Sequence, residues 1–264
     1  MKTKLFAALL AAGLLLGLYA CGGPEGEASD DKLSAILAKG ELIVAMEGTW
    51  APWTYHNEND ELVGYDVEVA KAIAEKLGVK ATFVEGEWDG LLAGVDAGRY
   101  DMVVNGVDID EERAEKYDFS EPYAYGRTAV IVKGDSPIGK LEDLDGKQTA
   151  NTITSTYAKV AEKYGATVTA VDDLNQTFEL LLNGRIDATL NDEVAYYDYM
   201  AQHPEADLRI ACFDTDMTRK AIPMPKGETA LVEAVNKALA ELAEEGKLSE
   251  LSVKYFGTDI SKNG

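Results

Sequence analysis

The stretch Gly98-Arg99-Tyr100-Asp101-Met102-Val103-Val104-Asn105-Gly106 has a counterpart further along the chain, Gly184-Arg185-Ile186-Asp187-Ala188-Thr189-Leu190-Asn191-Asp192. In both copies a leucine-rich, helix-like run ends at the glycine, the residue that most often follows a helix C-terminus. Arg-x-Asp then leads into a short apolar run that is typical of a buried strand. One copy alone is compatible with a common helix-to-strand connector, whereas two copies favour two lobes of similar architecture.

Both copies end in polar residues, Asn105-Gly106 in the first and Asn191-Asp192 in the second. Open α/β sheets bind their ligands just beyond the carboxyl ends of their strands. The two strand ends are therefore expected to lie at one site that the lobes share.

Helix-like and strand-like segments alternate along the chain, which predicts an α/β fold: two lobes of mixed, largely parallel sheet flanked by helices. The segment after about residue 215 is too short to be a domain, so we expect it to return to the first lobe. Two strands then cross between the lobes and form a hinge. The expected boundaries are 33–128 for the first part of lobe 1, 129–219 for lobe 2 and 220–264 for the return to lobe 1.

The N-terminus reads as a leader, which we assign to residues 1–20. Lys2 and Lys4 precede an uncharged stretch that is shorter than the roughly 20 residues of a membrane-spanning helix. Its end, Leu18-Tyr19-Ala20-Cys21-Gly22, resembles a bacterial lipoprotein signal, which predicts lipidation of Cys21; a plain secretory signal cut near Ala20 is the alternative. The polar segment 21–32 is expected to be a tether to the membrane outside the cytoplasm.

The composition excludes several classes of function. The 264 residues include 25 basic and 47 acidic side chains, for a net charge of −22, so nucleic acid is not an expected partner. There are only two histidines, and no nucleophile elbow, zinc-protease motif or Cys-x-x-Cys occurs. We therefore expect a monomer with no catalytic residues, no metal and no cofactor.

Three places in the sequence could bind the charged ends of a small molecule. Arg113, one turn into a short helix beyond the first strand end, could grip a carboxylate, or pair with Glu111 or Glu112 on the surface. Asp192 could bind a cation in the cleft, cap the following helix, or do both. The helix opening at Thr154-Ser155-Thr156 could offer hydroxyls and N–H groups to an anion, or be simply capped.

Aromatic residues near strand ends could form the wall of a pocket. Trp50 and Trp53 flank Ala51-Pro52, and Trp88 precedes Asp89, which is expected to cap a helix. Large aromatics are more often core residues, and the loop position makes Trp50 the best candidate of the three.

Together these segments resemble a known family, the extracytoplasmic solute-binding proteins of ATP-driven amino-acid importers, which have the type II periplasmic binding protein fold. The resemblance covers Leu42 to Phe256. The motifs that carry it are Gly48-Thr49-Trp50-Ala51-Pro52-Trp53, Leu62-Val63-Gly64-Tyr65-Asp66, Trp88-Asp89-Gly90-Leu91, Tyr117-Asp118-Phe119-Ser120-Glu121-Pro122-Tyr123 and Asn191-Asp192-Glu193.

The resemblance implies two lobes that close over a free amino acid and deliver it to a membrane permease. By position, it implies that Arg113 binds the ligand carboxylate with help from Ser155 and Thr156. It further implies that Asp192 and the Gly106 carbonyl bind the ammonium. Trp50 corresponds to an aromatic over the ligand, and Trp88 and Glu47 correspond to residues that contact its side chain.

Asp108 departs from the family pattern, because many relatives have Ser or Thr there. If Asp108 points inward, the excess of negative charge favours a ligand with more than one cationic group; if it points outward, it is a helix-capping residue. The run from Thr149 to Tyr157 and the residues after Asn191 also resemble the cystine-binding branch. Cystine or another polar amino acid is therefore the first expectation, and a basic amino acid is the second.

Two other functions remain open from the sequence. The same fold hosts prephenate-type dehydratases, in which case Glu47 or Asp108 would be the general acid. The chain could also be an extracellular amino-acid sensor, although no membrane-spanning segment follows the domain.

Overall fold

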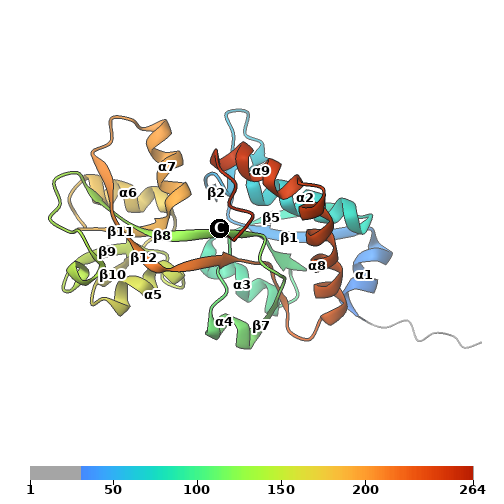
Figure 1. Cartoon of the computed structure of the whole chain (residues 1–264). Helices are drawn as coiled ribbons and strands as arrows, with labels where there is room; N and C mark the ends of the chain where they lie inside the picture. Colours follow the sequence, from blue (N-terminus) through green and yellow to red (C-terminus); the bar gives the residue numbers. More distant parts are fainter. Residues whose placement is uncertain (1–30, 264) are drawn as a thin grey trace, which may run out of the picture.

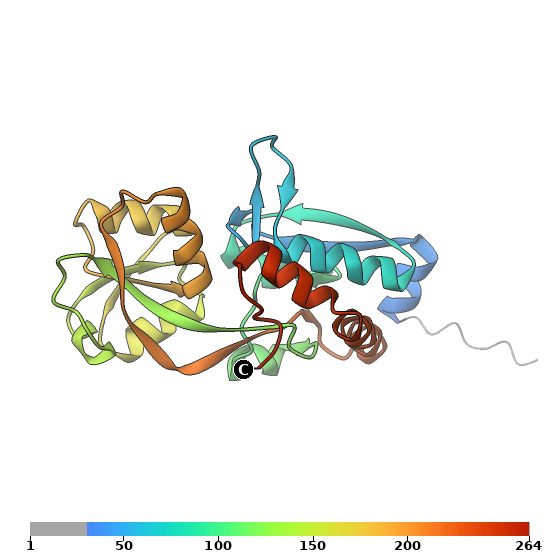
Figure 2. The ribbon, with the colours of Figure 1, turned by 45° about the horizontal axis from the view of Figure 1, so that its top comes forward.

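The computed structural model describes residues 31–263 and forms two lobes that are joined by two long strands (Figures 1 and 2). The predicted α/β architecture of two lobes is therefore confirmed. The leader 1–20, Cys21 and the tether up to residue 30 lie outside the described residues. The first helix, α1 (Lys32–Lys39), begins at the expected end of the tether, where the Asp31 carboxylate accepts a hydrogen bond of 2.7 Å from the Ser34 N–H.

Lobe 1 is built on a parallel sheet in the order β5-β1-β6. Its central strand β1 is apolar: Leu42, Val44 and Met46 on one face and Ala45 on the other have no exposed surface, as expected for a strand covered on both faces. The strands of the sheet are β1 (Glu41–Met46), β5 (Lys80–Glu85) and β6 (Met102–Val103). The helices in this part of the chain are α2 (Tyr65–Leu77), α3 (Trp88–Asp96) and α4 (Glu111–Lys116).

Short strands complete lobe 1 where the sequence indicated loops. A small antiparallel sheet contains β2 (Thr49–Trp50), β3 (Thr54–His56) and β4 (Leu62–Val63). The C-terminal segment returns to this lobe, as expected: β13 (Pro223–Pro225) pairs with β7 (Tyr117–Phe119). The last helices, α8 (Thr229–Glu244) and α9 (Lys247–Phe256), lie beside α2 in Figure 1.

Lobe 2 has a smaller sheet of the same kind. Its parallel strands are β9 (Gln148–Asn151) and β10 (Thr167–Ala170), and a parallel bridge between Thr149 and Ala188 connects β9 to the segment leading into β11 (Thr189–Asp192). A 3-10 turn, η1 (Leu141–Leu144), precedes this sheet. The helices are α5 (Thr156–Lys163), α6 (Leu174–Leu182) and α7 (Glu193–Gln202).

The hinge consists of two paired antiparallel strands, β8 (Ala124–Lys133) and β12 (Leu208–Lys220), which run from one lobe to the other in Figure 1. β12 continues well past the strand that the sequence predicted. The register between the two strands shifts between Phe213 and Met217. Such an irregularity weakens the ladder locally, at the level where the chain passes between the lobes.

The repeated Gly-Arg-x-Asp phrase has the same structural role in each lobe. Gly98 and Gly184 both have positive φ, at 68° and 67°, just after α3 and α6. The Asp101 carboxylate accepts a 2.7 Å hydrogen bond from the N–H of Ile43 in β1, and Asp187 accepts one of 2.8 Å from Gln148 in β9. Each aspartate therefore fastens its own strand to the neighbouring strand of its sheet.

The sequence favours Asp66, like Asp89, as a helix cap, and both predictions are wrong for the same physical reason. Helix α2 begins at Tyr65, with Gly64 at the N-cap, and the fully buried Asp66 accepts a 2.7 Å hydrogen bond from the Tyr123 hydroxyl. Helix α3 begins at Trp88, and Asp89 accepts hydrogen bonds from Thr154 of the other lobe. In both cases a partner that is distant in sequence binds the carboxylate.

Candidate functional site

A cavity of about 490 Å³ lies between the lobes, beside the hinge. Several strands end there, which is where open α/β sheets bind ligands. The predicted residues that line the cavity are Glu47, Trp50, Trp88, Gly106, Asp108, Arg113, Ser155 and Thr156. Asp192 is the predicted residue that does not line it.

Arg113 is buried, with 5% of its surface exposed, and it is not the surface residue of the alternative interpretation. One terminal nitrogen donates to the Asp108 carbonyl and the other to the Thr154 carbonyl, each at 3.0 Å. Its Nε lies 3.4 Å from the Asp110 carboxylate, and the guanidinium stacks over Trp88 at 5.1 Å. Because a guanidinium has five N–H donors, each terminal nitrogen retains one for a carboxylate.

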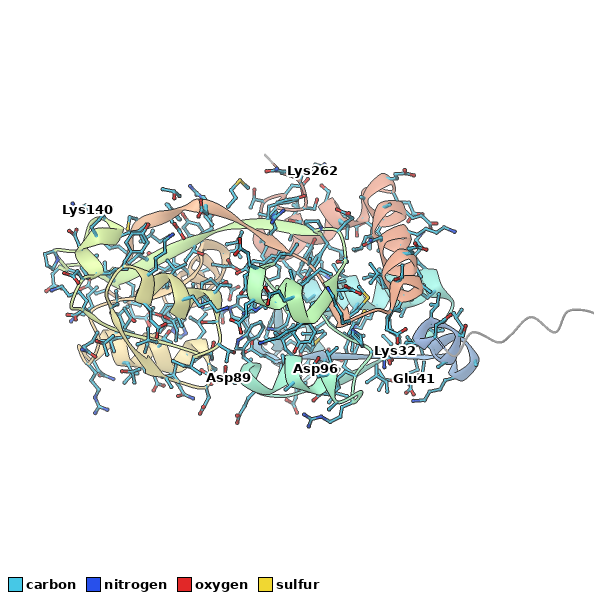
Figure 3. The ribbon with its side chains drawn as sticks, turned by 90° about the horizontal axis from the view of Figure 1, so that it is seen from below. Lys32, Glu41, Asp89, Asp96, Lys140 and Lys262 are labelled. Carbon is cyan, nitrogen blue, oxygen red and sulfur yellow. The ribbon has the colours of Figure 1, made fainter. Side chains whose placement is uncertain are left out.

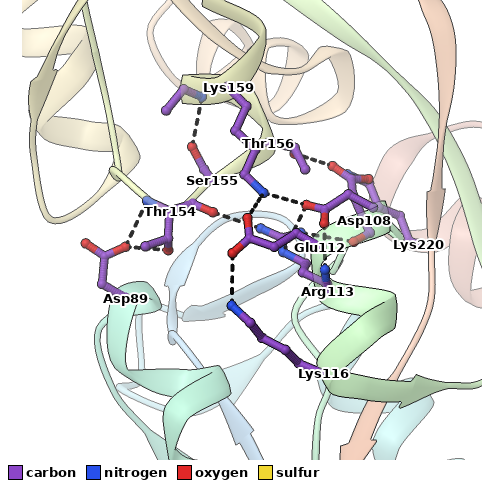
Figure 4. A network of polar contacts seen from close by, with 12 residues as sticks. Asp89, Asp108, Glu112, Arg113, Lys116, Thr154, Ser155, Thr156, Lys159 and Lys220 are labelled. Carbon is purple, nitrogen blue, oxygen red and sulfur yellow. Dashed lines mark hydrogen bonds and ion pairs between the residues drawn. The ribbon is translucent and has the colours of Figure 1, made fainter. Parts of the chain in front are cut away.

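Opposite Arg113 stands the start of helix α5, in lobe 2. Ser155 is its N-cap, and the Ser155 hydroxyl accepts a 3.1 Å hydrogen bond from the Ala158 N–H. The next residue, Thr156, donates a 2.6 Å hydrogen bond to the Asp108 carboxylate of lobe 1 (Figure 4). The N-terminus of a helix favours negative charge, so this wall suits the carboxylate end of a ligand.

Asp108 points inward and is 6% exposed. Besides Thr156, its carboxylate contacts the ammonium of Lys220, at 2.8 Å. The inward orientation is the one for which the sequence predicted an excess of negative charge in the site. Lys220 reduces that excess by one charge, because it brings a positive charge to the same carboxylate.

The carboxylate of Asp192 forms an ion pair with the same lysine. Its carboxylate lies 3.0 Å from Lys220 Nζ, and Asp192 and Lys220 are 1% and 0% exposed. Asp192 also takes the N-cap position of α7, but its side chain makes no capping hydrogen bond. The structure therefore gives this carboxylate an internal cation where the sequence predicted a ligand ammonium.

The three charged groups change one another's ionisation. Burial alone would lower the pKa of Lys220, but the charges of Asp108 and Asp192 outweigh it and raise the pKa, so the lysine remains an ammonium. Burial raises the pKa of Asp192 to about 6, against the opposing effect of Lys220. At neutral pH Asp192 is therefore mainly a carboxylate and Lys220 an ammonium.

A second acidic group lines another part of the cavity. The Glu47 carboxylate accepts a 2.6 Å hydrogen bond from the Asn105 side-chain amide, and Asp173 also lines the cavity. Burial raises the pKa of Glu47 to about 7, and the charges of Asp173 and Asp89 act in the same direction, while Asn105 opposes the shift. A cation placed beside Glu47 would favour its ionised form.

Trp50 lines the cavity on the lobe 1 side and is supported by Trp53 behind it. Trp50 stacks on Trp53, with ring centroids 5.5 Å apart, and donates its indole N–H to Asn191. Gly106 has a φ of 51°, and a Cβ atom at this position would come within 2.8 Å of the Trp50 ring. Glycine is therefore required here by the backbone and by the close approach of the ring.

Two buried polar atoms on the cavity wall have no hydrogen-bond partner among the described residues. They are the indole nitrogen of Trp88 and the side-chain oxygen of Asn151. Because nearly all buried polar groups in proteins are hydrogen-bonded, one free donor and one free acceptor at a cavity indicate a polar ligand.

Sequence reasoning missed several cavity residues. Asn151 is the last residue of β9. Open α/β sheets bind ligands beyond the carboxyl ends of their strands, so the reasoning that identified Asn191 could also have identified Asn151. Tyr157 lines the cavity from the first turn of α5, although the sequence indicated only a core residue. Lys220 gave no local signal except a charge at the start of the apolar run Ala221-Ile222.

Polar contacts hold the two lobes together around the cavity. Asp89 accepts hydrogen bonds from the Thr154 N–H and hydroxyl, at 3.2 and 2.6 Å. Lys159 of lobe 2 lies 3.0 Å from both Asp110 and Glu112 of lobe 1 (Figure 4). Asp89 is seen at the boundary between the lobes in Figure 3. The lobes are therefore closed over the cavity.

Two further features bear on the class of site. Within residues 31–263, no cluster of three or more His, Cys, Asp or Glu side chains is arranged to hold a metal ion. Over the same residues, no helix has both the length and the apolar character needed to cross a bilayer.

Two lobes closed by a hinge over a buried polar cavity define a two-lobed ligand-binding protein. The chain belongs to family 3 of the bacterial extracellular solute-binding proteins, which it matches over residues 42–258. It is 38% identical to a probable amino-acid ABC transporter-binding protein of Haemophilus influenzae, over 99% of this chain and 100% of the relative.

Solved structures show the same fold. An ancestral arginine-binding protein bound to arginine is 37% identical, with a TM-score of 0.78 over 83% of this chain and 99% of that one. The L-cystine solute receptor of Neisseria gonorrhoeae, unliganded and open, is 38% identical, with a TM-score of 0.60 over 88% and 99%.

Proposed function

We propose that the protein binds one free amino acid outside the cytoplasmic membrane and delivers it to an ABC-type importer. The observation that carries the proposal is the buried Arg113, which has one unused N–H on each terminal nitrogen and faces a closed cavity. The family and the Haemophilus relative, which is named as an amino-acid ABC transporter-binding protein, support the same function.

The ligand carboxylate would bind Arg113, Ser155 and Thr156. Its ammonium would lie near Gly106, where the negative charge of Asp108 and Asp192 exceeds the positive charge of Lys220. Trp50 would cover the ligand, and Trp88 and Glu47 would contact its side chain. Because residues of both lobes would bind each charged end, the ligand would favour the closed arrangement of the lobes.

The preferred ligand is cystine or another polar amino acid, with a basic amino acid second. The carboxyl of Glu47 and the free acceptor on Asn151 suit a second polar or cationic group, which both classes have. The gonococcal relative is a cystine receptor and the ancestral one was solved with arginine, so relatives exist for both candidates.

Isothermal titration with a panel of amino acids tests the proposal. We expect one site per chain, and we expect Arg113→Ala to lose at least about 100-fold in affinity, because a charge-assisted bidentate pair is lost in a buried site. Lys116→Ala, one turn further along the same helix but on the exposed side, is the matched control. Unchanged affinity in Arg113→Ala would refute the carboxylate assignment.

We further propose that the protein performs no chemistry on its ligand. The alternative dehydratase would use Glu47 or Asp108 as a general acid. Incubation with prephenate, followed by ultraviolet absorbance, distinguishes the two: no turnover is expected, and turnover abolished by Glu47→Gln would establish an enzyme.

The importer, the membrane anchor and the monomeric state belong to the same proposal. Lipidated Cys21 would tether the domain near a permease. In intact cells, Cys21→Ala should release the protein from the membrane fraction. Retention of this variant in the membrane fraction would contradict lipidation at that residue.

A further inference from the structure

Lys220 lies at the end of the hinge strand β12, between the two lobes. Its ammonium contacts Asp108 of lobe 1 at 2.8 Å and Asp192 of lobe 2 at 3.0 Å, and its side chain has no exposed surface. It also lies 3.3 Å from the hydroxyl of Tyr157, which lines the cavity, and 6.0 Å from the centre of the Trp50 ring. Lys220 therefore stands directly behind the cavity wall, beside the residues proposed to bind the ligand ammonium.

A contribution to stability alone does not account for these charges. Removing two carboxylates and an ammonium from water costs free energy that their mutual attraction seldom repays, and a cluster of apolar residues would be no less stable. Asp108, Asp192 and Lys220 instead lie where their net charge acts on a ligand in the cavity. Charges in a buried site interact strongly because little water screens them.

The charges of the site match those of one zwitterion. Asp108 and Asp192 supply two negative charges and Lys220 supplies one positive charge, which leaves one negative charge for a single ligand ammonium. Arg113 supplies the one positive charge for the carboxylate. Without Lys220, the same wall would carry two negative charges and would favour a more cationic ligand.

We propose that Lys220 is a specificity-determining residue, which sets this end of the cavity for a ligand with one ammonium, as in an ordinary α-amino acid. This inference rests on the proposed function. Lys220 acts through its charge and does not contact the ligand.

The test compares arginine with the uncharged amino acid of the panel that binds most tightly, by isothermal titration at pH 8. The measured quantity is the affinity for arginine divided by the affinity for the uncharged ligand. Lys220→Met should raise this ratio about tenfold, because one unit of positive charge is lost near the ligand. Asp108→Asn should lower it by a similar factor, and the double variant should return close to the wild-type ratio.

Two controls separate the charge effect from loss of structure or of closure. Lys159→Met removes another lysine that bridges the lobes, but this lysine is half-exposed and does not line the cavity, so the ratio should not change. Lys220→Arg retains the charge and should retain the ratio. If Lys220→Met does not fold, Asp108→Asn, which has nearly the same shape as the wild type, decides the question.

The outcomes distinguish this inference from the proposed function. If wild type binds no amino acid in the panel, the proposed function fails. If wild type binds amino acids, but Lys220→Met and Asp108→Asn both leave the ratio within about twofold of the wild-type value, the role of Lys220 is refuted and the proposed function stands.

Discussion

The indole N–H of Trp50 donates a 3.1 Å hydrogen bond to the side-chain oxygen of Asn191, and this bond joins lobe 1 to lobe 2 across the buried site. The same oxygen accepts a 2.9 Å hydrogen bond from the N–H of Asp192. A residue that covers the cavity is thus also part of the contact that closes it. Ligand affinity and lobe closure should therefore respond together to changes at Trp50.

Trp50→Phe should weaken binding by about three- to tenfold, the usual worth of one neutral hydrogen bond of roughly 1 kcal/mol. The aromatic ring remains, so the loss reports the interlobe bond. Isothermal titration with the amino acid that binds most tightly measures this loss of affinity. Asn191→Leu removes the acceptor of the same bond. In a double-mutant cycle, the losses of affinity from Trp50→Phe and Asn191→Leu should be less than additive. Full additivity would mean that the bond does not contribute to binding.

Gly106→Ala should disturb the site without unfolding the protein. The added methyl group would meet the Trp50 ring at 2.8 Å and must adopt a φ of 51°, which is unfavourable for alanine. We expect Trp50 to move and affinity to fall at least about tenfold. Gly90→Ala is the control, because no atom lies within 4 Å of the position of its Cβ. Wild-type affinity in Gly106→Ala would show that the ring can move aside freely.

Binding of a basic amino acid should depend on pH through Glu47. Its pKa is raised to about 7, so the side chain is largely neutral at pH 6 and ionised at pH 8. The ionised Glu47 carboxylate attracts a cationic ligand side chain. The affinity for such a ligand should therefore increase with pH, by at most about tenfold per pH unit below the pKa of Glu47. Glutamine should show only the smaller increase expected from Asp192, whose pKa is about 6 and whose ionised form would attract the α-ammonium of any amino acid.

Glu47→Gln provides the matched variant for the pH series. It retains a group that can hydrogen-bond to Asn105 but cannot ionise. Titrations with arginine from pH 6 to pH 8 should give a profile in this variant no steeper than that of glutamine in wild type, because only Asp192 still titrates near the ligand. An increase as steep as in wild type would mean that another group controls the pH dependence.

Asp89 should contribute to the closed state of the unliganded protein. Its carboxylate accepts two hydrogen bonds from Thr154 of the other lobe, and no residue of its own helix competes for it. Asp89→Ala should therefore shift the population toward open lobes and increase the radius of gyration in small-angle X-ray scattering. Saturating ligand should restore the compact value. An unchanged radius without ligand would mean that Asp89 does not hold the lobes together.

The architecture could be predicted from the sequence because its signals are local. Gly98 and Gly184 follow helices, and Asp101 and Asp187 precede strands, so each copy of the phrase specifies a helix and a strand within a few residues. The two aspartates then bind equivalent neighbouring strands, at 2.7 and 2.8 Å. Because the same local sequence pattern occurs in both lobes, both lobes have the same helix-to-strand arrangement.

The site was predicted less completely, because its side chains bind partners from distant segments. Asp66 and Asp89 have the sequence context of helix caps, yet Tyr123 and Thr154 bind them in the fold. Asp192 was predicted to meet a ligand ammonium, and in the structure it meets that of Lys220. No local pattern encodes a lysine that joins Asp108 to Asp192, since three separate segments must first come together.

A crystal structure with the tightest-binding amino acid tests the central claim most directly, by locating the two charged ends of the ligand. The account predicts a ligand carboxylate within about 3 Å of both terminal nitrogens of Arg113, and an ammonium near Gly106 on the side of Asp108. A ligand bound in the reverse orientation, or outside the cavity between the lobes, would contradict it.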